Sequence, residues 1–194
     1  MKSTTLSLLV ASVATLALIP GCATNDPVTQ TNTANASASK IARDSRAALD
    51  SLYAQNPAAR AIGQKAKGVL VFPSILKGGF VVGAQAGNGA MIRNTGDIGG
   101  FYQTTAASYG FQAGVQEFGY ALFLMNDEAF RNLNSSGGWD VGSSPSLVVV
   151  DKGAAANLSV ATLDKGTYAF IFNQRGLMGG IGLQGSKITR IYPK

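Results

Sequence analysis

The sequence predicts an α+β fold, with two short N-terminal helices packed on a strongly bent, glycine-rich, mostly antiparallel sheet or partial barrel. The first observation behind this prediction is the apolar spacing, which is helical between Ser39 and Lys67 and shortens to strand-length runs from Gly68 onward. The second is the distribution of glycine, because 22 of the 24 glycines lie in residues 68–194. Glycines inside apolar strands indicate sharp bends or close backbone approach, which a coiled sheet requires.

Two helices are predicted before the sheet. Asn56-Pro57 indicates the end of the first helix and the cap of the second, because proline is favoured at the first helical position. The second helix is expected from Ala58 to about Lys67, with Gly68 ending it. The first helix begins after Ser39 and has one apolar face, formed by residues at intervals of three and four: Ile41, Ser45, Ala48, Leu49, Leu52 and Tyr53.

Eight strands are expected in the glycine-rich part, separated by turn signals. A further short helix is predicted at Asp127–Leu133, capped by Asn126. The turn signals are Lys77-Gly78-Gly79, Gly87-Asn88-Gly89, residues 94–97 and residues 173–176. The predicted strands are residues 69–72, 80–86, 90–93, 105–116, 120–125, 146–150, 167–172 and 179–184.

The first 21 residues are predicted to be an export signal. One positive charge at Lys2 precedes an uncharged run over residues 3–19, and the small residue Gly21 lies directly before Cys22. A membrane-spanning helix is the less favoured interpretation, because a span needs about 20 predominantly apolar residues. This run contains several Ser and Thr residues and stops at Pro20.

Residues 18–22, LIPGC, resemble the lipobox of bacterial lipoproteins, in which a peptidase cuts before an acylated cysteine. The resemblance implies lipid attachment at Cys22, the one cysteine of the chain, and the alternative is an ordinary signal peptide followed by an unmodified thiol. Ala23 after the cysteine implies, by the bacterial sorting rule, the outer membrane of the cell envelope, facing the periplasm or the surface. We therefore expect a signal peptide at 1–21, a lipidated flexible tether at 22–39, too polar to form a core, and one domain at 40–194.

Positive charge is concentrated in the two predicted helices. Residues 37–67 contain six bases and two acids, a net +4, whereas the much longer stretch 68–194 has nine bases and seven acids. Such asymmetry favours an anionic partner surface, and the alternative is that these residues are the solvated faces of two ordinary helices. The candidate lipid-binding residues are Lys40, Arg43, Arg46, Arg60, Lys65 and Lys67.

Catalytic and metal chemistry have little support in this sequence. The chain contains no histidine, which removes the usual general base and the commonest metal ligand. Its carboxylates are scattered next to turn residues, and Glu117 is the one acid inside an apolar strand region. We expect no cofactor, no metal and no enzymatic activity. Nucleic acid is not expected as a partner either, because the aromatic residues are not interleaved with bases.

Several spaced blocks resemble the SYLF domain, which occurs in bacterial exported proteins and in yeast and animal adaptor proteins. The blocks are AKGVLVFP at 66–73, GGFVVG at 78–83, Gly87-Asn88-Gly89, GFQAG at 110–114, residues 121–126 and RGLMGGIGLQGS at 175–186. The resemblance covers roughly residues 40–191. It implies membrane-lipid binding, especially of anionic phosphoinositides through the basic N-terminal helical part in animal relatives, and actin binding in yeast relatives.

The sequence therefore predicts a non-enzymatic, lipid-anchored envelope protein whose SYLF-like domain binds anionic phospholipid or packs against the membrane surface. The position of the basic stretch directly after the expected tether favours this interpretation. The alternative is a module that binds a protein partner in the envelope or on a surface, with actin-binding-like behaviour implied by the family resemblance.

Overall fold

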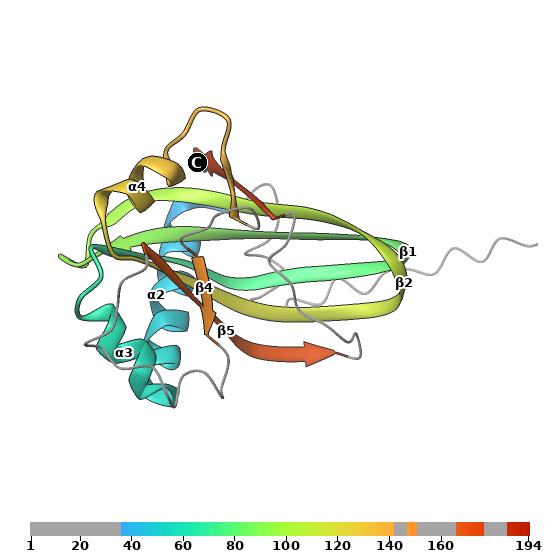
Figure 1. Cartoon of the computed structure of the whole chain (residues 1–194), viewed down its shortest axis with the longest axis horizontal. Helices are drawn as coiled ribbons and strands as arrows, with labels where there is room; N and C mark the ends of the chain where they lie inside the picture. Colours follow the sequence, from blue (N-terminus) through green and yellow to red (C-terminus); the bar gives the residue numbers. More distant parts are fainter. Residues whose placement is uncertain (1–35, 142–146, 151–165, 177–185) are drawn as a thin grey trace, which may run out of the picture.

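A computed structural model describes residues 36–141, 147–150, 166–176 and 186–194 of this chain. The expected signal peptide, Cys22 and the predicted strand at 179–184 lie outside the described residues. The described part has three helices and a curled sheet, so the predicted α+β fold with a strongly bent, mostly antiparallel sheet is confirmed (Figure 1).

The two N-terminal helices form at the predicted places, with small shifts at their ends. Helix α2 (Ala38–Gln55) begins two residues before Lys40, because the Ser37 side chain accepts a hydrogen bond from the Lys40 N–H and caps the helix. Residues from Ala36, which is buried, therefore belong to the fold. Helix α3 (Pro57–Gly63) is capped by Asn56 and ends before Lys67, whose N–H already bonds to the sheet at the Leu124 carbonyl.

Two very long strands form a hairpin that makes up most of the sheet. Strand β1 (Gly68–Arg93) pairs antiparallel with β2 (Ile98–Leu124), and the turn between them lies where residues 94–97 predicted it. The turns predicted at Lys77-Gly78-Gly79 and Gly87-Asn88-Gly89 are wrong, because both triplets lie inside β1 and pair with β2. Five of the predicted strands are thus parts of two continuous ones, which bend together at the right of Figure 1.

The bend is so tight that the two halves of β1 pack against each other. A Cβ atom at Gly89 would overlap the Val71 carbonyl oxygen, and one at Gly87 would lie 2.7 Å from the Ser74 carbonyl oxygen. Helix α2 fixes this crossing through the buried Ser45 hydroxyl, which donates to the Val71 carbonyl at 3.1 Å and accepts from the Ala90 N–H at 3.2 Å. The glycines of the predicted turn therefore permit close approach between distant parts of one strand.

Shorter strands extend the sheet from the outer edge of β2. The order is β3-β6-β2-β5-β4: β6 (Lys187–Ile191) pairs with the first part of β2 and β5 (Thr167–Gly176) with its last part. β3 (Trp139–Asp140) pairs with β6, while β4 (Leu147–Val150) runs parallel to β5. The turn predicted at 173–176 is wrong, because Asn173 (φ 51°) lies at a register shift within the β2–β5 pairing.

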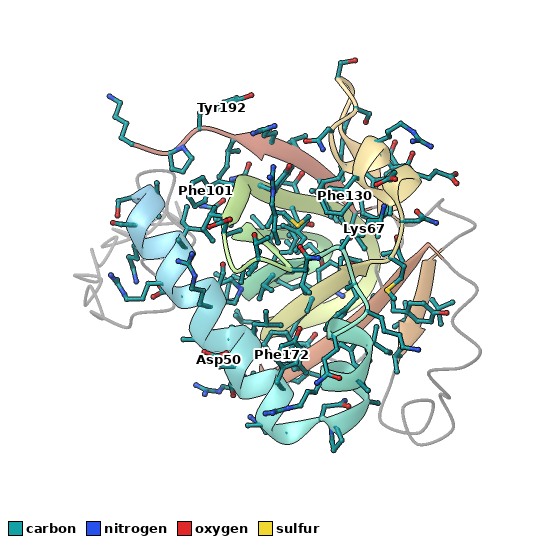
Figure 2. All side chains as sticks on the ribbon, turned by 90° about the vertical axis from the view of Figure 1, so that its left-hand side faces the viewer. Asp50, Lys67, Phe101, Phe130, Phe172 and Tyr192 are labelled. Carbon is teal, nitrogen blue, oxygen red and sulfur yellow. The ribbon has the colours of Figure 1, made fainter. Side chains whose placement is uncertain are left out.

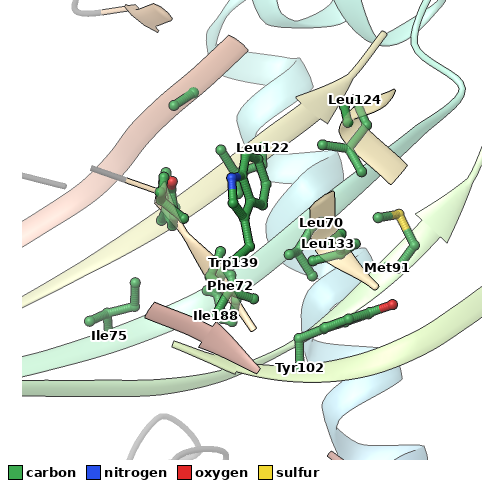
Figure 3. Close-up of a cluster of buried hydrophobic side chains, with 14 of the residues drawn as sticks. Leu70, Phe72, Ile75, Met91, Tyr102, Leu122, Leu124, Leu133, Trp139 and Ile188 are labelled. Carbon is green, nitrogen blue, oxygen red and sulfur yellow. The ribbon is translucent and has the colours of Figure 1, made fainter. Parts of the chain in front are cut away.

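Both faces of the sheet are buried over residues 69–72 and 120–124, which explains the continuous apolar runs there. The inner face encloses a core that includes Leu70, Phe72, Leu122 and Trp139 (Figure 3). Helix α4 (Asp127–Leu133), which has the predicted bounds and the predicted cap at Asn126, packs against this core. The outer face is covered by α2 and α3.

The crossing of β1 generates a prediction about Gly89. Replacing Gly89 with Ala should destabilise the protein by about 3 kcal/mol or more, because overpacking against fixed backbone cannot be relieved by a side-chain movement. For a protein of this size such a loss lowers the Tm by roughly 10 °C. Gly78→Ala in the same strand is the matched control, since its nearest neighbour would be at 3.8 Å. Equal Tm values of the two variants by circular dichroism would disprove the tight crossing.

Candidate functional site

The six predicted basic residues lie on α2, on α3 and in the connection between α3 and β1. At the first turns of α2, Lys40 Nζ is 2.7 Å from Asp44 Oδ2, and its side chain is only 17% exposed. Arg43 Nε is 3.6 Å from the other oxygen of Asp44, but the Arg43 side chain is 67% exposed. Lys40 is therefore largely neutralised by Asp44, whereas most of the Arg43 side chain faces solvent.

Two arginines tie the helices to their neighbours through backbone carbonyls. Arg46 Nη2 donates to the Gly96 carbonyl of the β1–β2 turn at 3.2 Å. Arg60 Nε donates to the Tyr53 carbonyl at 3.3 Å, which joins α3 to the end of α2. Both side chains are exposed, and a carbonyl partner leaves the positive charge of each guanidinium uncompensated.

The last two bases lie between α3 and the sheet. Lys65 is exposed, and Lys67 Nζ forms an ion pair with Asp127 Oδ1 at 2.7 Å. The hydrogen bond and the charge of Lys67 lower the pKa of Asp127, so this carboxyl stays ionised beside the lysine. Asp127 and Glu128 lie in the first turn of α4, where the helix dipole favours acids.

These residues surround one end of the molecule, where α2 and α3 meet the β1–β2 turn; we call it the turn end. The contact of Arg46 with Gly96 and the hydrogen bond from the Asn94 N–H to the Lys67 carbonyl place α2, the turn and the α3–β1 connection side by side. Figure 2 looks onto this end, with Asp50 on α2 and Lys67 nearer to α4. The 18 residues of α2 span about 27 Å, so the bases form an extended surface and do not converge on one point.

A groove of 480 Å³ lies within the turn end, between α2, α3 and the turn. Asp50 and Arg60 both line it, together with Tyr53. Burial, and secondly the charge of Asp50, raises the pKa of Tyr53 to about 12, so its hydroxyl remains a neutral donor at physiological pH. Arg93 at the end of β1 lines the groove as well, so its charged lining consists of one acid and two bases.

The sequence predicted no catalytic arrangement. Two further residues, Glu117 and Trp139, lie within the strands of the sheet. Glu117 is half-buried in β2, in register with Leu76 and Arg175. Trp139 is buried in the inner core. Within the described ranges, no three His, Cys, Asp or Glu side chains are grouped to hold a metal ion. No helix among these residues is long and apolar enough to cross a bilayer.

Two arginines that the sequence analysis did not single out lie on the inner face of the sheet, close to the turn. Arg93 is the last residue of β1, and Arg190 of β6 is paired with Tyr102 of β2. Both side chains are exposed. They are 97 positions apart, so only the β2–β6 pairing brings them together, and no local pattern in the sequence signals it.

Comparison with known proteins gives one family match, which lies in the sheet region. Residues 105–191 match the family Ysc84, described as Las17-binding protein actin regulator, and a search of curated proteins finds no significant match. The matched stretch runs from within β2 to the end of β6, whereas the six basic residues precede it. The family is one of binding domains. The sheet region thus matches the model of the Ysc84 (SYLF) domain family over residues 105–191, in line with the resemblance in the sequence.

Proposed function

We propose that this protein binds the surface of an anionic phospholipid membrane through the turn end. The observation that supports this proposal is the extended set of exposed bases, Arg43, Arg46, Arg60 and Lys65; of its three arginines, only Arg43 forms an ion pair with a carboxylate of the described residues. A planar, laterally extended array of phosphate groups complements such a surface better than a single small ligand does.

The six bases should contribute unequally to the free energy of membrane binding, because some of them form ion pairs with acids. A base near an anionic leaflet contributes about 1 kcal/mol, but Lys40 and Lys67 each have a carboxylate at 2.7 Å that offsets their charge. The free energy of membrane binding should therefore come mainly from the exposed arginines Arg43, Arg46 and Arg60. This contribution is salt-dependent, because exposed charges are screened over about 10 Å at 0.1 M ionic strength.

The cellular context that we propose is the bacterial cell envelope. A lipid on Cys22 would hold the domain at the bilayer, and the proposed outer-membrane location follows from Ala23. A tether of about 13 residues, before the start of the fold at Ala36, would reach roughly 20 Å on average, which keeps α2 close to the lipid surface. A basic surface beside the anchor would add an electrostatic contribution to the attachment.

A protein partner is the second candidate, and the family description favours it. Las17 binding and actin regulation are activities named for the Ysc84 family, whose match covers β5, β6 and most of β2. A partner of that kind would bind through the matched sheet region, away from the bases of α2 and α3. The two candidates therefore predict different sensitive residues.

The lipid proposal predicts the effect of neutralising exposed bases. In the chain 23–194, the triple substitution Arg43→Gln, Arg46→Gln and Lys65→Gln should weaken binding to vesicles containing phosphatidylglycerol at least tenfold, because about 2 to 3 kcal/mol of electrostatic attraction is lost. Long polar side chains on exposed helix faces change helix propensity little. Co-sedimentation across a salt series measures the effect.

The matched control removes the same net charge elsewhere, through Arg131→Gln, Arg175→Gln and Lys187→Gln. These three exposed residues lie on α4, β5 and β6. Equal weakening by both triple variants would show that only the total charge matters. Binding that survives the α2–α3 substitutions and does not depend on salt would contradict the proposal and indicate apolar insertion.

The anchor proposal predicts the outcome of Cys22→Ser in cells. The substitution removes the sulfur that would carry the lipid, so the protein should move from the membrane fraction to the soluble envelope fraction. Fractionation followed by mass spectrometry of the N-terminal peptide measures both location and acylation. Unchanged membrane association, with no fatty acid on wild-type Cys22, would refute the anchor, and retention in the inner membrane would refute the outer-membrane location.

A further inference from the structure

We propose that Arg93 and Arg190 form a discrete binding site for a phosphate group on the inner face of the sheet beside the β1–β2 turn. The two arginines come from β1 and β6, the strands on either side of β2. Neighbouring strands lie about 4.8 Å apart, so the axes of β1 and β6 are roughly 10 Å apart across β2. Arg190 pairs with Tyr102, whereas Arg93 lies beyond the pair of Ile92 with Ile98, so the two arginines are also offset along β2. Long side chains that lean toward each other from these positions can hold one small anion between them.

The strand between them has glycines where the two side chains lean over it. A Cβ atom at Gly99 would lie 3.0 Å from Arg93 Nε, and one at Gly100 would lie 3.4 Å from Arg190 Nη2. The register shifts at this point, because Met91 pairs with Gly100 and Ile92 with Ile98. Both guanidinium groups therefore lie over adjacent residues of β2, and larger side chains there would displace them.

Both arginines are on the same face of the sheet. The Gly99 position also faces Met91, and the Gly100 position faces Tyr102; Met91 and Tyr102 belong to the same inner core. The charges of Arg190 and Arg93 both act on the Tyr102 hydroxyl, although burial dominates and raises its pKa. The two cations are thus close enough to influence one phenol.

A hydrogen-bond network positions Arg190. Asn134 Oδ1 accepts from the Tyr102 hydroxyl at 3.0 Å and from Arg190 Nη1 at 3.4 Å. The Tyr192 ring lies 5.7 Å from the Arg190 guanidinium carbon, in cation–π geometry. These contacts restrict the guanidinium group on two sides while leaving the arginine side chain exposed.

The chemistry of the pair favours a phosphate group. Neither arginine forms an ion pair with a carboxylate among the described residues, whose ion pairs involve Lys40, Arg43 and Lys67. Two close guanidinium groups repel each other, and an anion between them relieves the repulsion. Arginine presents paired N–H donors that match the oxygens of phosphate. A phosphate group offers enough oxygens for both arginines.

Neither arginine lies on α2 or α3, but Arg93 also lines the groove of the turn end, so the site adjoins the membrane surface proposed above. The same phosphate chemistry can come from free inorganic phosphate or from the phosphomonoester headgroup of a lipid. The two sources are distinguished by testing sodium phosphate alone and vesicles of neutral lipid containing phosphatidic acid. Vesicles with phosphatidylglycerol at equal charge density provide the diester comparison.

The test compares two double variants of the chain 23–194 with matched loss of charge. Arg93→Gln with Arg190→Gln should weaken phosphate binding at least tenfold, measured by isothermal titration calorimetry in 0.15 M sodium chloride. Arg131→Gln with Arg175→Gln should leave it within about twofold of wild type. Arg190→Lys keeps the charge but loses the paired donors, so its affinity should be intermediate. Circular dichroism checks that every variant remains folded.

Each outcome supports or overturns the site. If one phosphate ion binds per chain with saturation, and only the first double variant loses this binding, the result supports the site with free phosphate as its ligand. If the wild type binds phosphatidic acid more tightly than phosphatidylglycerol and only the first double variant loses this preference, the result supports the site with a lipid ligand. This holds even when free phosphate does not bind. Equal loss in both double variants, or no binding in either arm, overturns it. Binding to phosphatidylglycerol through α2 and α3 can persist in every case.

Discussion

The close crossing of the two halves of β1 is the contact on which the rest of this structure depends. At Gly87 and Gly89 the strand passes so near to Ser74 and Val71 that no side chain fits between them. The buried Ser45 hydroxyl bonds both halves, through the Val71 carbonyl and the Ala90 N–H. Buried backbone groups left without partners would each cost about 1–3 kcal/mol, so one serine both satisfies the crossing and attaches α2 to it.

This attachment determines where the charges of α2 lie. With Ser45 fixed against β1, the next residue, Arg46, meets the Gly96 carbonyl of the turn. The start of β1 is held beside the end of the same strand by the hydrogen bond from the Asn94 N–H to the Lys67 carbonyl. Bases from α2, α3 and the α3–β1 connection therefore gather at one end because the sheet folds back on itself.

Features set by local chemistry could be predicted from the sequence. Asn56-Pro57 and Asn126 cap their helices as expected, because a cap depends on a side chain and the backbone within three residues. The two glycine triplets in β1 were predicted as turns, because local statistics do not distinguish a glycine that turns the chain from one that allows a distant strand to approach. Gly89 approaches Val71, 18 positions away, and only the folded sheet reveals this.

In the candidate site, too, local features could be predicted from the sequence, whereas contacts between distant residues could not. Composition alone identified the six bases of residues 37–67, but not which of them are offset by an acid. The pair formed by Lys67 and Asp127 joins residues 60 positions apart, and it depends on how α4 packs beside the start of β1. Arg93 and Arg190 were missed for a related reason, since β6 was not predicted as a strand and its pairing with β2 brings them together.

The central claim is that the turn end faces an anionic membrane, and spin labels at two positions test it most directly. The chain 23–194 contains no cysteine, so Thr95→Cys in the turn and Val115→Cys near the bend of the hairpin each carry one label. Thr95 is exposed and Val115 is 60% exposed.

The measurement is the accessibility of each label to a water-soluble nickel chelate, with and without phosphatidylglycerol vesicles. We expect vesicles to protect the label at position 95 and to leave the label at position 115 accessible. Protection at position 115 with position 95 still accessible would contradict the account, because the membrane would then meet the bend of the hairpin instead of the basic helices.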